Sequence, residues 1–519
     1  IRDLVKEYAE KHMPQGTVGQ KIGSLYRMYM DTVARNRMGY EPIKPALAEV
    51  AAIKNRKQCE RVMYELGAKG YGTMLFGFGL GQDAINSDQY IFGANQGGIG
   101  LDPEYYTQPN EQQKAVVAAY KSLMKDLFKM VGNSEAMAEK KMQAAFAIED
   151  QIARQSYDQV KSRDPQANIH KMSWQDLLRD YPGIDWKQLC LAYGYPSDID
   201  SVDVGQPEPI HEVEKILATA DLFALKATLE ASVISSSVSL LSDDFVNRRF
   251  EYTKAVYGVK EQQPRWKRGL GFVQGLMGES IGKLYVAKYF PESSKQRVVE
   301  MVHNLQDAFA QRIGESTWMT DATKAKAIEK LRSMRINIGY PDKWQNMEEY
   351  VQIDESKSLR ANYDEIIPAL RRRSLEKKWR KPVDKTVFAC NPQMVNAFYA
   401  PTFNSINFPA AILQAPFFDA EADDAANYGA IGAVIGHEMS HGFDDQGCQF
   451  DKDGNLNNWW TDEDKANYSQ RTKVLADWFS AQEVQPGLKV NGEKTLGENI
   501  GDNGGINVAF RALQNVMAK

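Results

Sequence analysis

The sequence predicts a mainly α-helical fold that is divided into more than one lobe. At 519 residues, the chain exceeds the size at which a single hydrophobic core stops growing. Apolar residues recur at helical spacing over much of the first 335 residues. Further along, a small apolar stretch leads into His437-Glu438-Met439-Ser440-His441, and this spacing carries chemical meaning only on a helix.

Helices are predicted from the beginning of the chain. Residues 1–52 are expected to form two helices with a break near Met13-Pro14-Gln15-Gly16. An apolar stripe at helical spacing marks the face that packs on the core, and it consists of Ile22, Leu25, Tyr26, Tyr29 and Val33. Residues 75–101 are rich in glycine and predict a small region of strands and turns. Two long amphipathic helices follow in 110–162, and shorter helices continue to about residue 335.

The C-terminal part mixes strands with helices. Met394 to Tyr399 is rich in strand formers and is expected to pair with Ser405 to Phe408 across a turn. Residues 430–441 predict a buried helix, because small and apolar residues precede the first histidine. Gly442 follows the second histidine, where a helix can end or bend.

Composition excludes several classes of function. The formal net charge is −5, which gives a nucleic-acid partner no electrostatic support. The basic run in 371–381 is best explained as the solvated face of a helix. The four cysteines lack C-x-x-C spacing, which argues against a thiolate metal site and against a dense disulfide framework. The sequence contains no apolar run of about eighteen residues, as a membrane span would need.

The H-E-x-x-H motif predicts a metal site. Residues four apart lie on one face of a helix, so His437 and His441 can bind one cation while Glu438 points at water on that cation. Zinc suits neutral imidazoles, and a catalytic zinc needs a third protein ligand. Glu498 is the candidate, and Asp502 could accept a hydrogen bond from the outer nitrogen of a ligating histidine. Without the histidine motif, such a carboxylate pair would more often be exposed or capping.

Four stretches together resemble the neprilysin family of zinc metallopeptidases, which includes the endothelin-converting enzymes and bacterial oligopeptidases. They are Val395 to Tyr399, Asn407 to Phe418, the H-E-x-x-H motif and Gly497 to Asp502, in the order in which the family carries them. The resemblance implies a thermolysin-like catalytic lobe built from 1–19 and 361–519. It also implies a large helical lobe, 20–360, that encloses a central cavity open to peptides and closed to folded proteins.

The resemblance further implies a zinc-dependent endopeptidase that cleaves oligopeptides on the amino side of bulky hydrophobic residues. One Zn²⁺ per chain is expected on His437, His441 and Glu498, with Glu438 as the general base. Asn396 and Ala397 are expected to hold the substrate backbone, although without the resemblance Asn396 would be taken to end a strand. The expected side-chain pocket consists of Ile412, Phe417, Ala433 and Val434.

One departure from the family pattern supports an alternative function. Relatives continue beyond the Glu-x-x-x-Asp motif, and that tail supplies a histidine for the oxyanion and an arginine for the substrate. No histidine follows His441 here. We expect the tail to exist outside this chain; the alternative is an inactive, metal-bearing protein that binds peptides. The resemblance favours a periplasmic, secreted or cell-surface protein of a bacterium, with a cytoplasmic location as the alternative.

Overall fold

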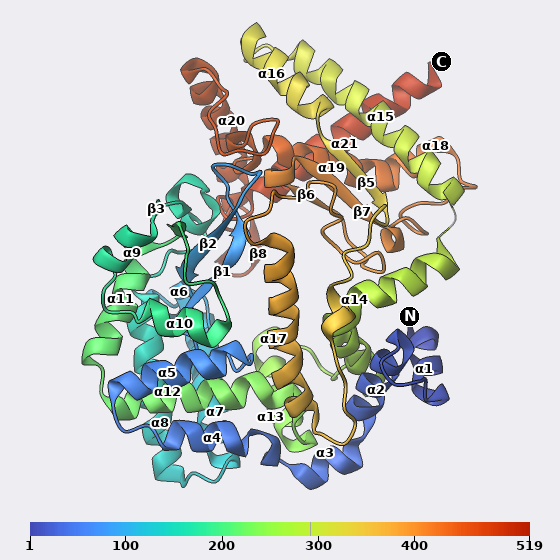
Figure 1. Cartoon of the computed structure of the whole chain (residues 1–519). Coiled ribbons are helices and arrows are strands. Elements are labelled where there is room, and N and C mark those ends of the chain that lie inside the picture. Colours follow the sequence, from blue (N-terminus) through green and yellow to red (C-terminus); the bar gives the residue numbers. More distant parts are fainter. Residues whose placement is uncertain (291, 519) are drawn as a thin grey trace.

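The computed structural model describes residues 1–290 and 292–518 and confirms a mainly helical fold with two lobes (Figure 1). Residues from about 40 to 260, coloured blue to green, form the lower lobe in Figure 1. Most of the orange and red C-terminal residues form the upper lobe, which carries the histidine motif. We call these the helical lobe and the metal lobe.

The helical lobe is a set of packed helices with one small sheet. Its helices are α4 (Lys44–Ala51), α5 (Arg56–Ala68), α6 (Pro103–Thr107), α7 (Glu111–Met130), α8 (Glu135–Ala153), α9 (Trp174–Asp180), α10 (Trp186–Tyr193), α11 (Pro207–Thr219), α12 (Leu222–Ser237) and α13 (Asp243–Tyr257). The sheet has the order β1-β2-β4-β3, from β1 (Phe76–Gln82), β2 (Tyr90–Gln96), β3 (Lys171–Ser173) and β4 (Ser201–Val204). The antiparallel pair β1 and β2 confirms the strands expected in 75–101.

A second group of helices packs beside both lobes. It contains α1 (Arg2–Lys11), α2 (Val18–Met30), α3 (Thr32–Met38), α14 (Arg265–Tyr289) and α17 (Leu359–Lys378). Two helices were expected in 1–52, but this segment forms four α-helices, α1 to α4. The prediction missed the break at Asp31, whose side chain accepts a hydrogen bond from the backbone N–H of Ala34 and so begins a new helix. Of the predicted stripe, Val33 is exposed, because it lies beyond this break.

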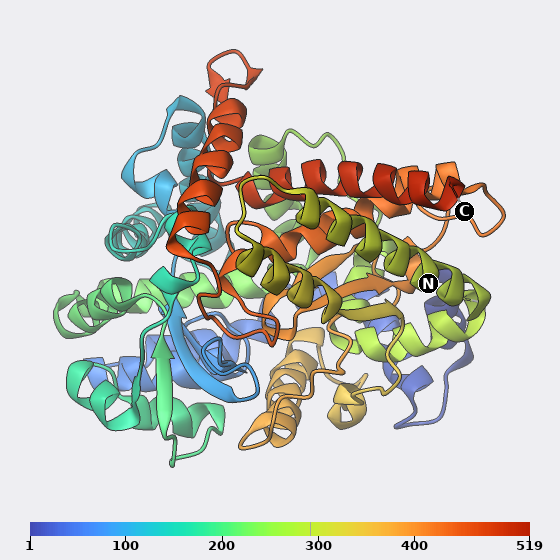
Figure 2. The ribbon, with the colours of Figure 1, turned by 90° about the horizontal axis from the view of Figure 1, so that it is seen from above.

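The metal lobe places helices around a three-stranded sheet. Its helices are α15 (Glu292–Glu315), α16 (Asp321–Arg332), α18 (Asp424–Asn427), α19 (Ala433–Ser440), α20 (Asp462–Ser480) and α21 (Leu496–Met517). The sheet has the order β5-β7-β6, from β5 (Arg335–Gly339), β6 (Phe398–Ala400) and β7 (Ser405–Pro409), and a hairpin joins β8 (Glu483–Gln485) to β9 (Leu488–Lys489). Seen from above, α21 runs beside α15 across this lobe (Figure 2).

One hydrophobic core joins these elements of the metal lobe. It includes Val302 and Leu305 of α15, Ile406 of β7, Ile435 of α19 and Val508 of α21. Segments on both sides of residue 360 therefore contribute to the lobe that holds the histidine motif. The boundary expected at residue 360 does not follow the division between the hydrophobic cores.

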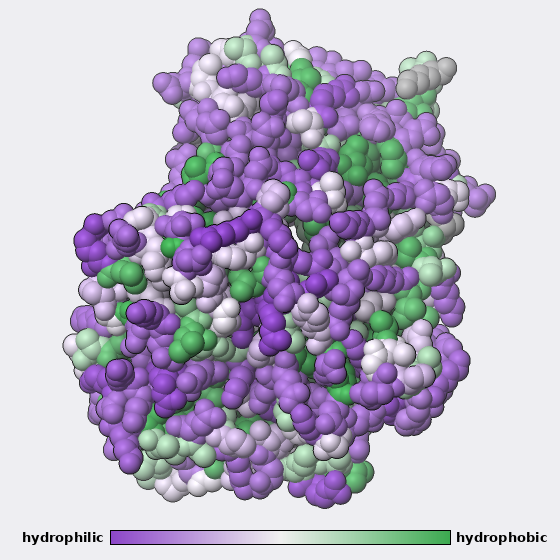
Figure 3. All heavy atoms as spheres, in the orientation of Figure 1, coloured by the Kyte–Doolittle hydropathy of each residue, from purple (hydrophilic) through white to green (hydrophobic). Residues whose placement is uncertain are grey.

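Figure 3 shows a mostly hydrophilic face on which apolar residues form small patches. Within residues 1–290 and 292–518, no helix combines the length and the apolar character that crossing a bilayer requires.

Candidate metal centre

Two helices of the metal lobe, α19 and α21, build the site. A Cβ atom at Gly505 of α21 would lie 2.5 Å from the carbonyl oxygen of Ala433 and 2.8 Å from the backbone nitrogen of His437. Only glycine permits this approach, since real Cβ contacts are not so short. The glycines of the Gly-Asp-Asn-Gly-Gly run therefore bring the first turn of α21 alongside the histidine motif.

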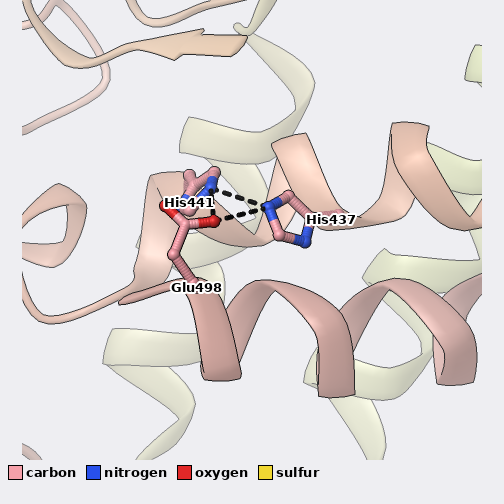
Figure 4. A group of neighbouring side chains, drawn as sticks. All are labelled: His437, His441 and Glu498. Atoms are coloured by element: carbon pink, nitrogen blue, oxygen red, sulfur yellow. Dashed lines mark hydrogen bonds and ion pairs between the residues drawn. The ribbon is translucent and has the colours of Figure 1, made fainter. Parts of the chain in front are cut away.

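The three expected metal ligands meet at one point (Figure 4). His437 Nε2 lies 3.0 Å from His441 Nε2 and 3.2 Å from Glu498 Oε2. His441 Nε2 lies 3.7 Å from the same carboxylate oxygen. In Figure 4 both imidazoles come from one helical segment and the carboxylate reaches them from the helix beside it. Among the described residues, no other group of three His, Cys, Asp or Glu side chains has this arrangement.

The outer nitrogen of each imidazole faces a carboxylate. His437 Nδ1 lies 2.9 Å from Asp502 Oδ1, as the sequence predicted. His441 Nδ1 lies 2.8 Å from Asp444 Oδ2, a partner that the sequence analysis missed. Its only signal was a carboxylate three residues after the second histidine, where a short 3₁₀ turn, His441–Phe443, brings it back to the ring.

This pattern of hydrogen bonds fits a cation. A neutral imidazole carries one N–H, and a carboxylate beside each Nδ1 favours the tautomer that donates from this nitrogen. The Nε2 lone pairs of His437 and His441 then point at each other and at the Glu498 carboxylate, an arrangement that is repulsive until a positive ion lies between them. Two imidazoles and one carboxylate form a donor set of the kind that catalytic zinc uses.

Asp444 is firmly held. Its side chain is 7% exposed, and Oδ1 accepts hydrogen bonds from the backbone N–H groups of Gln446 and Gly447 at 3.0 and 2.6 Å. Burial alone would lower the pKa of His441, but the hydrogen bond and the charge of Asp444 outweigh it and raise that pKa. The loop after the histidine motif thus fixes the orientation of the His441 ring.

Glu438 lies inside the site. Its side chain is buried, and this burial raises the pKa of the carboxyl group, against the opposing charges of His441 and His437. A cavity of about 430 Å³ joins Glu438 to both histidines, to Glu498 and to Asn396 and Ala397. A peptide in this cavity would lie within reach of the metal ligands and of the carboxyl group together.

Asn396 and Ala397 lie just before a strand. The strand predicted over 394–399 begins only at Phe398 and pairs antiparallel with β7, with Phe398 opposite Asn407. Asn396 is exposed, and its side-chain oxygen accepts a hydrogen bond from the backbone N–H of Ala397. The pairing with Ser405 to Phe408 is confirmed, while the first half of the expected strand is irregular.

The four apolar residues expected to form a side-chain pocket belong to the core around α19. Ile412 is buried in that core, and the other three pack against it; they are Phe417, Ala433 and Val434. None of the four lines the 430 Å³ cavity among the described residues. Their role in substrate binding stays a prediction.

Comparisons of sequence agree with the geometry. Residues 1–341 and residues 396–519 each match a model of peptidase family M13. The neutral endopeptidase of Lactobacillus helveticus is 30% identical over 519 residues, covering 99% of this chain and 79% of that protein. Human neprilysin is 30% identical over 539 residues, covering 96% of this chain and 71% of that protein.

Comparisons of structure lead to the same family. Zinc metalloprotease Zmp1 of Mycobacterium tuberculosis, in complex with an inhibitor, matches with a TM-score of 0.95 and 36% identity, covering 100% of this chain and 79% of that one. The open state of the same enzyme matches with a TM-score of 0.78, covering 100% of this chain and 81% of that one. The resemblance drawn from the sequence motifs is confirmed. Since family models match both lobes and the three candidate ligands converge, the chain belongs to peptidase family M13 and is a metalloendopeptidase.

Proposed function

We propose that the protein is a zinc-dependent endopeptidase that hydrolyses oligopeptides on the amino side of bulky hydrophobic residues. One observation carries the proposal: two imidazole nitrogens and a carboxylate converge beside a buried carboxyl group, in one cavity. His437, His441 and Glu498 would hold the ion. When bound, zinc supplies a Lewis acid that polarises the peptide carbonyl and lowers the pKa of water to about 7.

Glu438 is the proton carrier of the proposed reaction. Its carboxylate accepts a proton from the attacking water as the new C–O bond forms. The carboxyl group then gives this proton to the leaving nitrogen as the C–N bond breaks, so that each turnover returns Glu438 to its initial charge. The pKa of Glu438, raised by burial, favours this exchange, because a base is most effective when its pKa approaches the working pH.

The substrate backbone would bind along β6. In the order β5-β7-β6 this strand lies at the edge of its sheet, and Asn396 and Ala397 continue the edge into the cavity. A free edge can pair with an extended peptide without reading its sequence. Specificity would then come from Ile412, Phe417, Ala433 and Val434, whose apolar side chains favour a bulky hydrophobic residue. Equal cleavage of peptides with Ala, Leu or Phe after the scissile bond would contradict this preference.

We infer that the two lobes separate to admit a peptide. The mycobacterial relative has been solved both with an inhibitor and in an open state, and this chain is closer in fold to the inhibitor complex. We propose the same opening for this protein, with the present structure as its closed state. With bacterial relatives in two genera, we also propose a periplasmic, secreted or cell-surface location in a bacterium; fractionation of the source cells would test it.

The test is hydrolysis of a quenched fluorescent peptide that carries Leu or Phe after the scissile bond. We expect cleavage that a zinc chelator abolishes and added zinc restores, and cleavage by the zinc-loaded Glu438→Gln variant that is at least about a hundredfold slower. If the unaltered protein binds the peptide and stoichiometric zinc but releases no product, the endopeptidase proposal is wrong, and the protein only binds peptides.

A further inference from the structure

Arg163 brings a positive charge from the helical lobe to the metal centre. It ends a 3₁₀ turn, Lys161–Arg163, that follows α8, and its side chain is 23% exposed. The 430 Å³ cavity is lined by Arg163 together with His437 and His441. Among the described residues that line this cavity, Arg163 is the only arginine or lysine and the only one from the helical lobe.

The guanidinium group binds the loop that supports His441. Its Nη2 lies 3.1 and 3.2 Å from the two carboxylate oxygens of Asp445. Asp445 directly follows Asp444, the carboxylate that fixes the His441 ring. Beside this pair, Gln449 Nε2 of the same loop lies 3.3 Å from Asp164 Oδ1 of the helical lobe. The helical lobe therefore docks on the loop at two successive residues.

The same guanidinium group also lies against the beginning of α21. A Cβ atom at Gly497 would lie 2.5 Å from Arg163 Nη2 and 2.9 Å from Asp444 Oδ2. A side chain at position 497 would therefore displace the arginine from the point where it passes between the two segments. The next residue is Glu498, the candidate ligand from α21. One side chain of the helical lobe is therefore packed between the two segments that carry ligands.

Charge explains why an arginine suits this position. The segments that meet here carry the carboxylates of Asp444, Asp445 and Glu498, and Glu438 lines the same cavity. Like charges at this spacing repel one another, and a guanidinium group among them offsets part of that repulsion. When the lobes separate, the arginine leaves with its lobe and the carboxylates lose this partner.

We propose that Arg163 is a positioning residue through which closure of the helical lobe completes the metal centre. In the closed state it holds Asp445 and the start of α21, and thereby keeps Asp444 against His441 and Glu498 in reach of the ion. Metal binding and closure are then coupled: the closed state binds zinc more tightly, and zinc in turn favours closure, since such coupling is reciprocal. The inference rests on the lobe opening proposed above but not on peptide hydrolysis.

The test compares Arg163→Gln with Lys385→Gln. Lys385 Nζ also joins the lobes, since it lies 2.7 Å from Ser87 Oγ and 2.6 Å from the carbonyl oxygen of Asp453, but it does not line the metal cavity. Two quantities are measured for each protein: the zinc dissociation constant, by competition with a chromophoric chelator, and the radius of gyration by small-angle scattering with and without zinc.

We expect Arg163→Gln to raise the zinc dissociation constant about tenfold, the lower end of the effect seen for groups that support metal ligands. The unaltered protein should contract when zinc is added, and Arg163→Gln should lose most of this contraction. Lys385→Gln removes a contact between the lobes but leaves the partners of Asp444 and Glu498 in place, so it should raise the dissociation constant much less than Arg163→Gln does. Arg163→Lys keeps the charge but replaces the planar guanidinium group by a compact ammonium group, and it should fall between the two.

Two results would overturn the inference. The first is a zinc dissociation constant in Arg163→Gln that stays within about twofold of the unaltered value. The second is an equal rise in both variants, which would mean general loosening. If Arg163→Gln does not fold, Asp445→Asn removes the same contact from the other side and must weaken zinc binding similarly. Neither readout requires catalysis, so a protein that fails to cleave peptides can still support the inference.

Discussion

The two sides of the metal centre use the same hydrogen bond in different surroundings. On the α19 side, Asp444 meets His441 at 2.8 Å and its side chain is 7% exposed. On the α21 side, Asp502 meets His437 at 2.9 Å and its side chain is 75% exposed. Water and salt screen the exposed pair but not the buried one. The two hydrogen bonds are similar in length, but we expect the buried one to contribute more to metal binding.

A buried lysine accounts for much of this difference. Lys330 of α16 donates from Nζ to the carbonyl oxygens of Gly442, Gly447 and Phe450, each at 2.6 Å. These three acceptors span the loop that carries Asp444, so one ammonium group ties the loop down at several points. The α21 side has no comparable anchor among the described residues: Glu498 and Asp502 project from the first turns of a helix, and both are exposed.

The largest expected effect is on catalysis and comes from the α19 side. Glu438→Gln keeps the size of the side chain but removes its ability to carry a proton. We expect kcat to fall by about 10²–10⁴-fold, the usual contribution of general acid–base catalysis. The zinc content, measured by atomic absorption, should stay at one ion per chain, because the ligands are untouched. Retained turnover with bound zinc would remove Glu438 from the mechanism.

The anchor of the loop can be removed directly. Lys330→Met leaves three buried carbonyl oxygens without their donor, at about 1–3 kcal/mol each. We expect the free energy of unfolding to fall by at least about 3 kcal/mol in urea titrations. Lys326 lies one turn earlier on the exposed face of α16, and Lys326→Met should change stability by less than about 0.5 kcal/mol. Similar losses in the two variants would contradict the anchoring role.

The same lysine should leave a signature in the pH dependence of stability. Burial lowers the pKa of Lys330 to about 7, below its value of 10.5 in an unfolded chain. Between these values the unfolded state binds more protons than the folded one, so this group makes stability rise with pH, by up to about 1.4 kcal/mol per pH unit. Between pH 7 and pH 9, the free energy of unfolding of the metal-free protein should therefore rise more steeply than that of Lys330→Met. Parallel curves would exclude a titrating Lys330.

The buried carboxylate should matter more to the metal than the exposed one. In Asp444→Asn the single amide oxygen stays with the backbone N–H groups of Gln446 and Gly447, so the N–H₂ group faces His441 Nδ1 and cannot accept from it. The ring then no longer directs its Nε2 lone pair at the ion. We expect the zinc dissociation constant to rise about 10- to 100-fold. A chelator competition assay measures it, and an unchanged constant would show that the His441 ring needs no such support.

The smallest expected effect is on the α21 side. Asp502→Asn removes an exposed charge whose interaction with His437 is screened by water, so the zinc dissociation constant should rise less than about fivefold. The ratio of the zinc dissociation constants of Asp444→Asn and Asp502→Asn measures the difference between the two sides most directly. A larger effect for Asp502 than for Asp444 would reverse it.

The part of the site that could be predicted follows from local spacing. His437 with His441, and Glu498 with Asp502, are four residues apart, and helical geometry places each pair on one face whatever the rest of the fold does. Asp444 was missed because its contact depends on the 3₁₀ turn after α19, and sequence patterns indicate such turns only weakly. The general helical character of the first 335 residues was likewise predictable from periodicity.

The features that could not be predicted depend on contacts between distant segments. Arg163 reaches Asp445 across 282 residues, and no local pattern marks either side chain as a partner. The parallel pairing of Ile336 in β5 with Ile406 in β7 is also set by packing, so the core of the metal lobe crosses the expected boundary. Asp31 divides a helix that periodicity alone would continue, because its cap competes with the hydrophobic stripe.

X-ray absorption at the zinc edge tests the central claim most directly, because it identifies the atoms that surround the ion in the loaded protein. The account predicts nitrogen and oxygen neighbours at about 2.0–2.2 Å, with the multiple-scattering signature of two imidazoles that falls to one in His441→Ala. A sulfur neighbour at about 2.3 Å, or an imidazole signal unchanged in that variant, would contradict a metal centre built from His437, His441 and Glu498.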